Sequence, residues 1–175
     1  LGSGEQAMAA FRTSLDKQFD EPDWAWAGIG EVLAEQREYR QAAEAYRAAA
    51  QANPENDDWP YYQAINLKDA GFSAQALAIT SELVAQHPQV ARNWRQHGFV
   101  LATLGRAAEA IPALERSLQL DARQGKVWAA LIETYHHAGR FDDARRAYQT
   151  LRGIDAEFAG IAYREVIFPQ EESSR

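Results

Sequence analysis

The chain has 175 residues, of which 46% are hydrophobic and 11% aromatic, so a disordered polypeptide is excluded and one domain is the natural count. It has no cysteine and no apolar run long enough to span a bilayer, which excludes disulfides, a thiol nucleophile and direct membrane insertion. The net charge of −7 is uneven: residues 1–88 carry six basic and fourteen acidic side chains, whereas residues 89–175 carry twelve and eleven, without the basic stripe that nucleic-acid binding requires.

The first predicted element is an amphipathic helix over residues 5–19. Met8, Phe11, Leu15 and Phe19 recur there at helical spacing. We expect this helix, within the segment 1–22, to be half of a preceding hairpin or a cap on the repeats that follow.

From residue 23 the sequence repeats itself every 34 residues, over the segments 23–56, 57–90, 91–124 and 125–158. Three columns show this step: Trp26, Pro60, Trp94 and Trp128; Ala42, Ala76, Ala110 and Ala144; Gly71, Gly105 and Gly139. Each segment holds two apolar stripes at helical spacing, which predicts two helices joined by a turn. Glycine in the turn suits a left-handed helix end, and the small residues let the two helices approach closely.

The first segment carries Trp26-x-x-Ile29-Gly30-x-x-Leu33, then Ala42-x-x-x-Tyr46, and then Pro54. This pattern resembles the tetratricopeptide repeat family, and the resemblance covers residues 23–158 in four units without insertion. It implies an all-α fold: a right-handed superhelical solenoid of four helix-turn-helix hairpins with an N-terminal helix. We expect a C-terminal capping helix over residues 159–168 and a disordered polar tail over 169–175.

Several positions depart from the family pattern. Pro60 stands in the tryptophan column, and His97 replaces an apolar packing residue, so we expect a partly buried, hydrogen-bonded histidine. Pro112 lies about one turn inside a predicted helix, which indicates a late helix start or a bend. Paired acids at Asp57-Asp58 and Asp142-Asp143 are expected to complement or cap helix N-termini.

In this family the first helix of each hairpin lines the concave face, and projecting those helices gives the candidate ligand-binding residues. They are Trp24, Glu31, Tyr61, Tyr62, Ile65, Arg92, Arg95, Phe99, Lys126, Glu133 and His137. Aromatic side chains beside arginine are typical of interface anchors. We predict a helical or extended protein segment in this groove, with its acidic part at Arg92, Arg95 and Lys126. Solvated helix faces with scattered aromatics are the competing interpretation.

The resemblance implies a non-catalytic scaffold or adaptor for protein–protein interaction, and no residues cluster for acid–base or nucleophilic work. Glu133 and His137 lie four residues apart, but a structural metal site needs about four ligands, so we expect no metal and no cofactor. One alternative is an accessory module of a larger enzyme or of a secretion or envelope complex. Another is self-assembly, with Trp24, Trp59 or the terminal helices packing against a second copy.

Two further expectations concern partners and origin. The residues at the positions where some family members clamp a chaperone C-terminus do not form that clamp, so we expect no chaperone-tail binding. The lack of cysteine fits cytoplasm and periplasm equally. Fifteen arginines against three lysines, together with abundant alanine, favour a GC-rich bacterial source.

Overall fold

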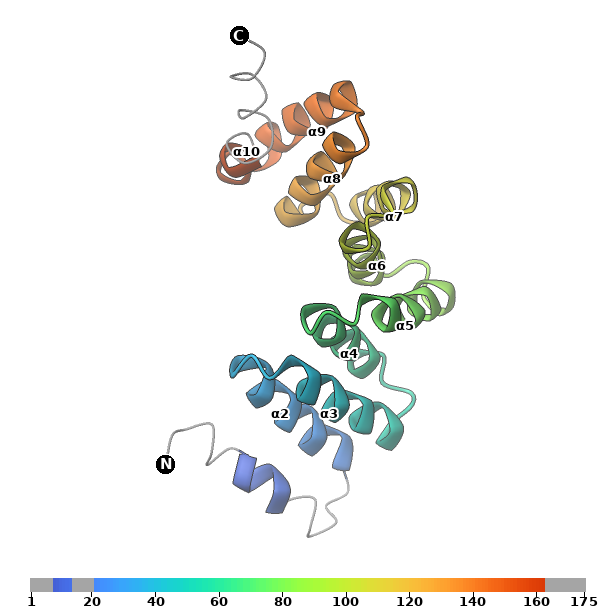
Figure 1. Cartoon of the computed structure of the whole chain (residues 1–175), viewed down its shortest axis with the longest axis vertical. Helices are drawn as coiled ribbons and strands as arrows, with labels where there is room; N and C mark the ends of the chain where they lie inside the picture. The colour runs from blue at the N-terminus through green and yellow to red at the C-terminus, as the bar shows by residue number, and fades with distance from the viewer. Residues whose placement is uncertain (1–7, 14–20, 163–175) are drawn as a thin grey trace. The chain divides into compact units, whose positions relative to one another are not determined.

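The computed structural model describes residues 8–13 and 21–162, and all regular secondary structure in these ranges is helical. A short helix over residues 8–13 comes first (Figure 1). The helices that follow are α2 (Pro22–Glu35), α3 (Tyr39–Ala52), α4 (Asp58–Asp69), α5 (Ser73–Gln86), α6 (Ala91–Thr103), α7 (Ala107–Leu120), α8 (Gly125–His137), α9 (Phe141–Ile154) and α10 (Ala156–Ala162). In this part of the chain no helix is both long and apolar enough to cross a bilayer. The prediction of an all-α fold of helical hairpins is confirmed.

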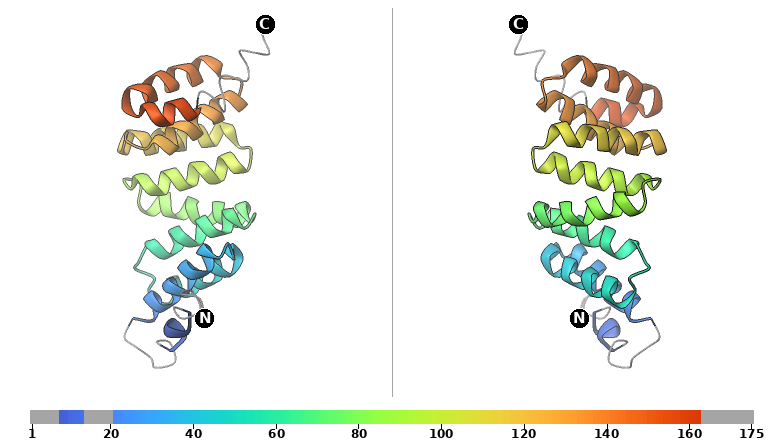
Figure 2. Two further views of the ribbon diagram at one scale, coloured as in Figure 1. Left: turned by 90° about the vertical axis from the view of Figure 1, so that its left-hand side faces the viewer. Right: turned by 90° about the vertical axis from the view of Figure 1, so that its right-hand side faces the viewer.

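The chain divides into two compact units, residues 1–83 and 84–175, with the division inside α5. In unit 1, α2 packs on α3 and α3 packs on α4. In unit 2, each of the helices α6 to α9 packs on the next, and α10 packs on both α8 and α9 (Figures 1 and 2). The acidic half of the sequence coincides with unit 1, because residues 84–88 carry no charged side chain.

Three of the hairpin turns rely on glycine. Gly71, Gly105 and Gly139 have φ values of 86°, 70° and 71°, a left-handed conformation in which a side chain would be strained. The predicted left-handed helix ends are therefore confirmed. The turn between α2 and α3 differs, because Arg37 occupies the same place in the repeat with a φ of 63°. The sequence pattern did not predict a positive φ at an arginine.

Small residues bring the two helices of a hairpin together, as predicted. A Cβ atom placed on Gly30 would lie 2.9 Å from the ring of Tyr46, and one on Gly98 would lie 2.6 Å from Leu114. Ala42 and Ala110 are fully buried at the corresponding crossings. The approach is too close for a larger side chain, so these positions set the geometry of each hairpin.

The tryptophan column is less buried than a core position would be. Trp94 and Trp128 are half-buried, and each donates its indole N–H at 2.9 Å to a carbonyl six residues earlier, at Pro88 and Ala122. Each indole therefore also fixes the loop that precedes its helix.

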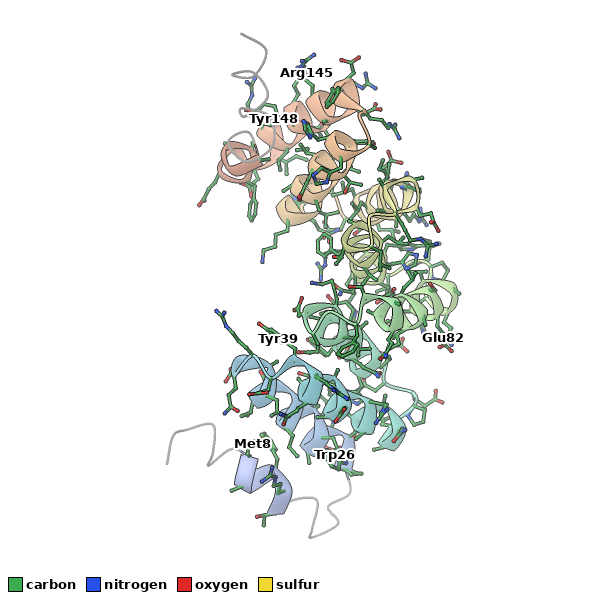
Figure 3. The ribbon with its side chains drawn as sticks, in the orientation of Figure 1. Met8, Trp26, Tyr39, Glu82, Arg145 and Tyr148 are labelled. Atoms are coloured by element: carbon green, nitrogen blue, oxygen red, sulfur yellow. The ribbon has the colours of Figure 1, made fainter. Side chains whose placement is uncertain are left out.

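The N-terminal helix contacts unit 1. Met8 and Phe11 pack against the buried cluster that includes Ile29 and Leu33, beside the half-buried Trp26 (Figure 3). This is where a capping helix or half-hairpin was expected. Only residues 8–13 of the predicted helix 5–19 can be compared, because the remainder lies outside the described residues.

Some local predictions were wrong. Helix α7 begins at Ala107, so Pro112 does not delay its start. Pro112 is exposed, where the carbonyl left without an N–H partner can bind water. Asp57 makes no side-chain cap to α4, and the Asn56 side chain accepts from the Asp58 amide instead. The other expected role, complementing the helix dipole, is met, because Asp58 lies in the first turn of α4 and Asp142 and Asp143 lie in that of α9. Helix α10 begins at Ala156 rather than 159, because Asp155 accepts the amides of Glu157 and Phe158. The tail 169–175 lies outside the described residues.

Candidate functional site

The first-helix face of unit 1 is aromatic. Trp24 on α2 and Tyr62 on α4 are 56% and 39% exposed, Glu31 is exposed, and Ile65 is half-buried. Tyr61 is only 6% exposed, so its expected place on the open face was wrong. The reason is that the buried stripe of α4 includes Tyr61 together with Ala64, three residues further along the helix.

A buried carboxylate joins α2 to the start of α4. Asp23 accepts hydrogen bonds from the indole N–H of Trp59 and from the side-chain amide of Asn53, both at 3.0 Å. Trp59 is 3% exposed, and Trp24 packs against it edge to face at 4.9 Å between centroids. Trp59 is therefore not available to a second copy of the chain, contrary to one alternative considered above. Its burial could not be predicted, because the partner that satisfies its N–H lies 36 residues away.

Two tyrosines of unit 1 stack on each other. Tyr46 reaches from α3 and stacks on Tyr62, with centroids 5.3 Å apart. Burial, and then the nearby Glu31 and Tyr62, raise the pKa of Tyr46 to about 12. Its phenol therefore stays neutral at physiological pH and acts as a packing group, and unit 1 offers an aromatic surface beside one carboxylate.

The first-helix face of unit 2 gathers basic side chains at the helix N-termini. Arg92 and Arg95 lie in the first turns of α6 and are half-buried, while Lys126 lies exposed in the first turn of α8. Helix α6 contains no acidic residue. The positive ends of the α6 and α8 dipoles add to the same potential. This end of the face suits a negatively charged group.

A polar network positions Arg95. Its guanidinium donates at 3.2 Å to Gln124, which immediately precedes α8. The Gln124 amide donates at 3.0 Å to the hydroxyl of Ser117 on α7, and that hydroxyl donates at 2.9 Å to the carbonyl of Ala91. The network links α6, α7 and the start of α8. The sequence did not indicate this role for either residue. Gln124 lies in a loop, Ser117 stands where other repeats have a packing residue, and no motif marks the two as partners.

The remaining candidates of unit 2 lie farther along the two helices. Phe99 is half-buried and packs against the core of this unit, so part of its ring is already used. Glu133 and His137 are exposed on α8 and line a pocket of about 270 Å³ between α6 and α8. Arg92 and Arg95 therefore lie near the N-terminal end of α6 and Lys126 near that of α8, whereas Glu133 and His137 line one pocket.

His97 lies on α6 near the basic end of this face. It is half-buried, as predicted, and its ring contacts that of Trp94 edge to face at 6.3 Å. Burial lowers the pKa of His97; Glu109 opposes this shift and Arg106 adds to it. The histidine is therefore held in its neutral form, which suits packing rather than binding of a negatively charged group.

A second polar group joins α7, α8 and the start of α9 in unit 2. The Tyr135 hydroxyl donates to Glu115, and the Arg140 guanidinium lies 4.7 Å from the centroid of the Tyr135 ring. Arg140 also bonds Asp143 at 2.6 Å. Burial is the main reason why the pKa of Tyr135 is raised, so this phenol is not a base or nucleophile. A pocket of about 360 Å³ between α7, α8 and α9 borders this group.

Over residues 8–13 and 21–162, no three His, Cys, Asp or Glu side chains gather closely enough to hold a metal ion. Glu133 and His137 therefore have no third potential ligand within that part of the chain.

The fold is similar to that of several solved structures. YrrB, described as a TPR protein with an unusual peptide-binding site, is 21% identical with a TM-score of 0.75, over 92% of this chain and 84% of that chain. MamA from Desulfovibrio magneticus RS-1, residues 41 to the end, is 17% identical with a TM-score of 0.79, over 89% and 88%. A double mutant of MamA RS-1 gives 0.80 at 17% identity, over 89% and 87%. These similarities establish the fold alone.

The sequence comparisons agree with the repeat pattern. The tetratricopeptide repeat family matches residues 25–56 and again residues 101–163. No curated protein is significantly similar to the chain. The two family matches, the 34-residue register and the paired helices lead to one conclusion: the chain belongs to the tetratricopeptide repeat family.

Proposed function

We propose that the protein is a non-catalytic scaffold that binds a protein segment on the first-helix face of unit 2, with an acidic part of that segment at Arg92, Arg95 and Lys126. The family is one of interaction scaffolds, which supports the general function. The acidic specificity is our inference from this chain.

The observation that carries the proposal is the concentration of positive charge at one end of a face without acidic residues on α6. Arg95 is held there by Gln124, so part of its side-chain entropy is already lost before a ligand arrives. A carboxylate can accept two parallel hydrogen bonds from a guanidinium, which makes arginine a suitable group for this recognition. The dipoles of α6 and α8 act in the same direction.

The test uses fluorescent twelve-residue peptides of alternating leucine and glutamate, or leucine and lysine, titrated into the full chain. We expect the acidic peptide to bind more tightly, and the double variant Arg92→Glu, Arg95→Glu to weaken it about tenfold or more, since close charge pairs at interfaces contribute about 1.5 kcal/mol or more.

The matched control is Arg145→Glu, Arg152→Glu, which changes the net charge equally at two exposed positions of α9 (Figure 3 labels Arg145). We expect at most a twofold change there, since long-range effects are screened at about 0.15 M salt. Equal losses in the two double variants, or equal binding of the acidic and basic peptides, would show that the proposed face is wrong.

A further inference from the structure

The pocket between α6 and α8 is lined by small residues and by four polar side chains. Its walls come from both helices, from the turn after α6 and from the first residue of α7: Ala102, Thr103, Gly105, Ala107, Ala130, Glu133, Thr134 and His137. Four of these residues are alanine or glycine and leave the space open. The others are two threonines, one glutamate and one histidine.

Most of these polar groups can only accept hydrogen bonds. The Thr103 hydroxyl donates at 2.9 Å to the carbonyl of Phe99, and the Thr134 hydroxyl donates at 2.6 Å to that of Ala130. Their hydrogens are therefore used, and only oxygen lone pairs remain. Glu133 adds an exposed carboxylate, and no hydrogen bond or ion pair involves it among the described residues. A pocket rich in acceptors with one negative charge is suited to a cationic donor.

Unit 1 has different side chains at the positions equivalent to this pocket. Two repeats earlier, Ala130 corresponds to Tyr62, and Glu133 corresponds to Ile65. The Tyr62 ring stacks on Tyr46 of α3. The open space and the carboxylate are therefore properties of unit 2, and not of the repeat as such.

We propose that this pocket is a subsite for a lysine or arginine side chain of the bound segment. The inference rests on the function proposed above and specifies its partner: an acidic part at the N-terminal ends of α6 and α8, and a basic side chain at Glu133. Lys126 and Glu133 are seven helical residues apart, about 10 Å at 1.5 Å per residue. The partner's two charges should therefore be about three residues apart in an extended segment, or about seven apart in a helix.

A small probe tests the pocket without any peptide. n-Butylguanidinium is titrated into the full ¹⁵N-labelled chain, and amide shifts are followed at Thr103, Gly105, Glu133 and His137. We expect saturable shifts for this cation and none for n-pentanol. The shifts should be lost in Glu133→Gln, at an exposed position that does not threaten folding, and in Ala130→Tyr, which copies unit 1. Equal shifts with n-pentanol, or shifts that survive Glu133→Gln, would overturn the cation subsite.

A comparison of peptides on the wild-type chain and on Glu133→Gln then tests whether the bound segment uses this pocket. Each acidic peptide in the series carries one lysine, and the peptides differ in the number of residues between that lysine and the acidic residues. Each has a partner peptide with norleucine in place of the lysine. In the wild-type chain the best lysine peptide should bind about fivefold tighter than its norleucine partner, and in Glu133→Gln less than twofold. If the acidic peptides bind but no lysine position gains affinity, the subsite is rejected and the acid-binding face stands. If no acidic peptide binds, the function itself is rejected, while the n-butylguanidinium titration still judges the pocket.

Discussion

Units 1 and 2 share one repeat register but use equivalent positions differently. Where unit 1 has Trp59, bonded to the buried Asp23, unit 2 has the fully buried Val127. Where unit 1 has Ile29, unit 2 has His97. At the Trp59 position, unit 1 therefore has a charged hydrogen-bonded network, whereas unit 2 buries the amide of Asn93 in one repeat and the apolar Val127 in the next. The repeat register determines which positions pack. The residue at each position determines how a unit is stabilised and which side chains it presents to a ligand.

The largest difference should appear on removing the buried carboxylate of unit 1. Asp23→Ala leaves the indole N–H of Trp59 buried without its acceptor, which should cost about 2–3 kcal/mol of unfolding free energy. Urea unfolding gives the total loss, and hydrogen exchange should locate it in α2 to α4. Glu21→Ala, at an exposed position two residues earlier, is the control and should change stability by less than about 0.5 kcal/mol. Faster exchange spread evenly over both units would contradict the local role of this network.

An intermediate effect should come from the turn residues. Arg37→Gly should stabilise unit 1 by about 0.5–1 kcal/mol, because glycine removes the strain of a positive φ and loses some of that gain to its greater unfolded-state entropy. Gly139→Ala should destabilise unit 2 by about 1 kcal/mol. No atom lies within 4 Å of a Cβ placed on Gly139, so the loss would be a backbone effect. Thermal unfolding of the two variants checks the opposite signs; changes of the same sign would show that the turns are not equivalent.

The smallest effect concerns acid sensitivity and distinguishes His97 from Ile29. Because the pKa of His97 is lowered in the folded state, the unfolded chain binds its proton first as the pH falls. The contribution of neutral His97 to the free energy of unfolding is therefore complete above the ordinary histidine pKa of about 6.5. It is lost progressively as the pH falls below that value towards the lowered pKa of His97 in the folded chain. His97→Leu should therefore flatten the decline in stability between pH 7 and pH 5, measured by urea unfolding. An unchanged slope would mean that carboxylates alone cause the acid sensitivity.

Much of the fold could be predicted from the sequence because repeated packing leaves a repeated pattern. The glycine turns and the small residues at Gly30 and Gly98 follow from backbone and steric rules that act locally. The candidate face was harder to predict, because exposure depends on how wide the buried stripe of each helix is. Tyr61 and Tyr62 illustrate this: they are adjacent and of the same residue type, yet Tyr61 is buried and Tyr62 is exposed.

By itself, the sequence determined the all-α class, the paired helices, their approximate limits and the placing of Arg92, Arg95 and Lys126 on first helices, since all of these depend on spacing along the chain. Only the tertiary structure decided that Asp23 meets Trp59, that Gln124 holds Arg95, and that Ala130 leaves a pocket beside Glu133. The physical reason is that these contacts join residues from different helices and loops. Their partners are selected by three-dimensional packing, and no local preference in the sequence records that selection.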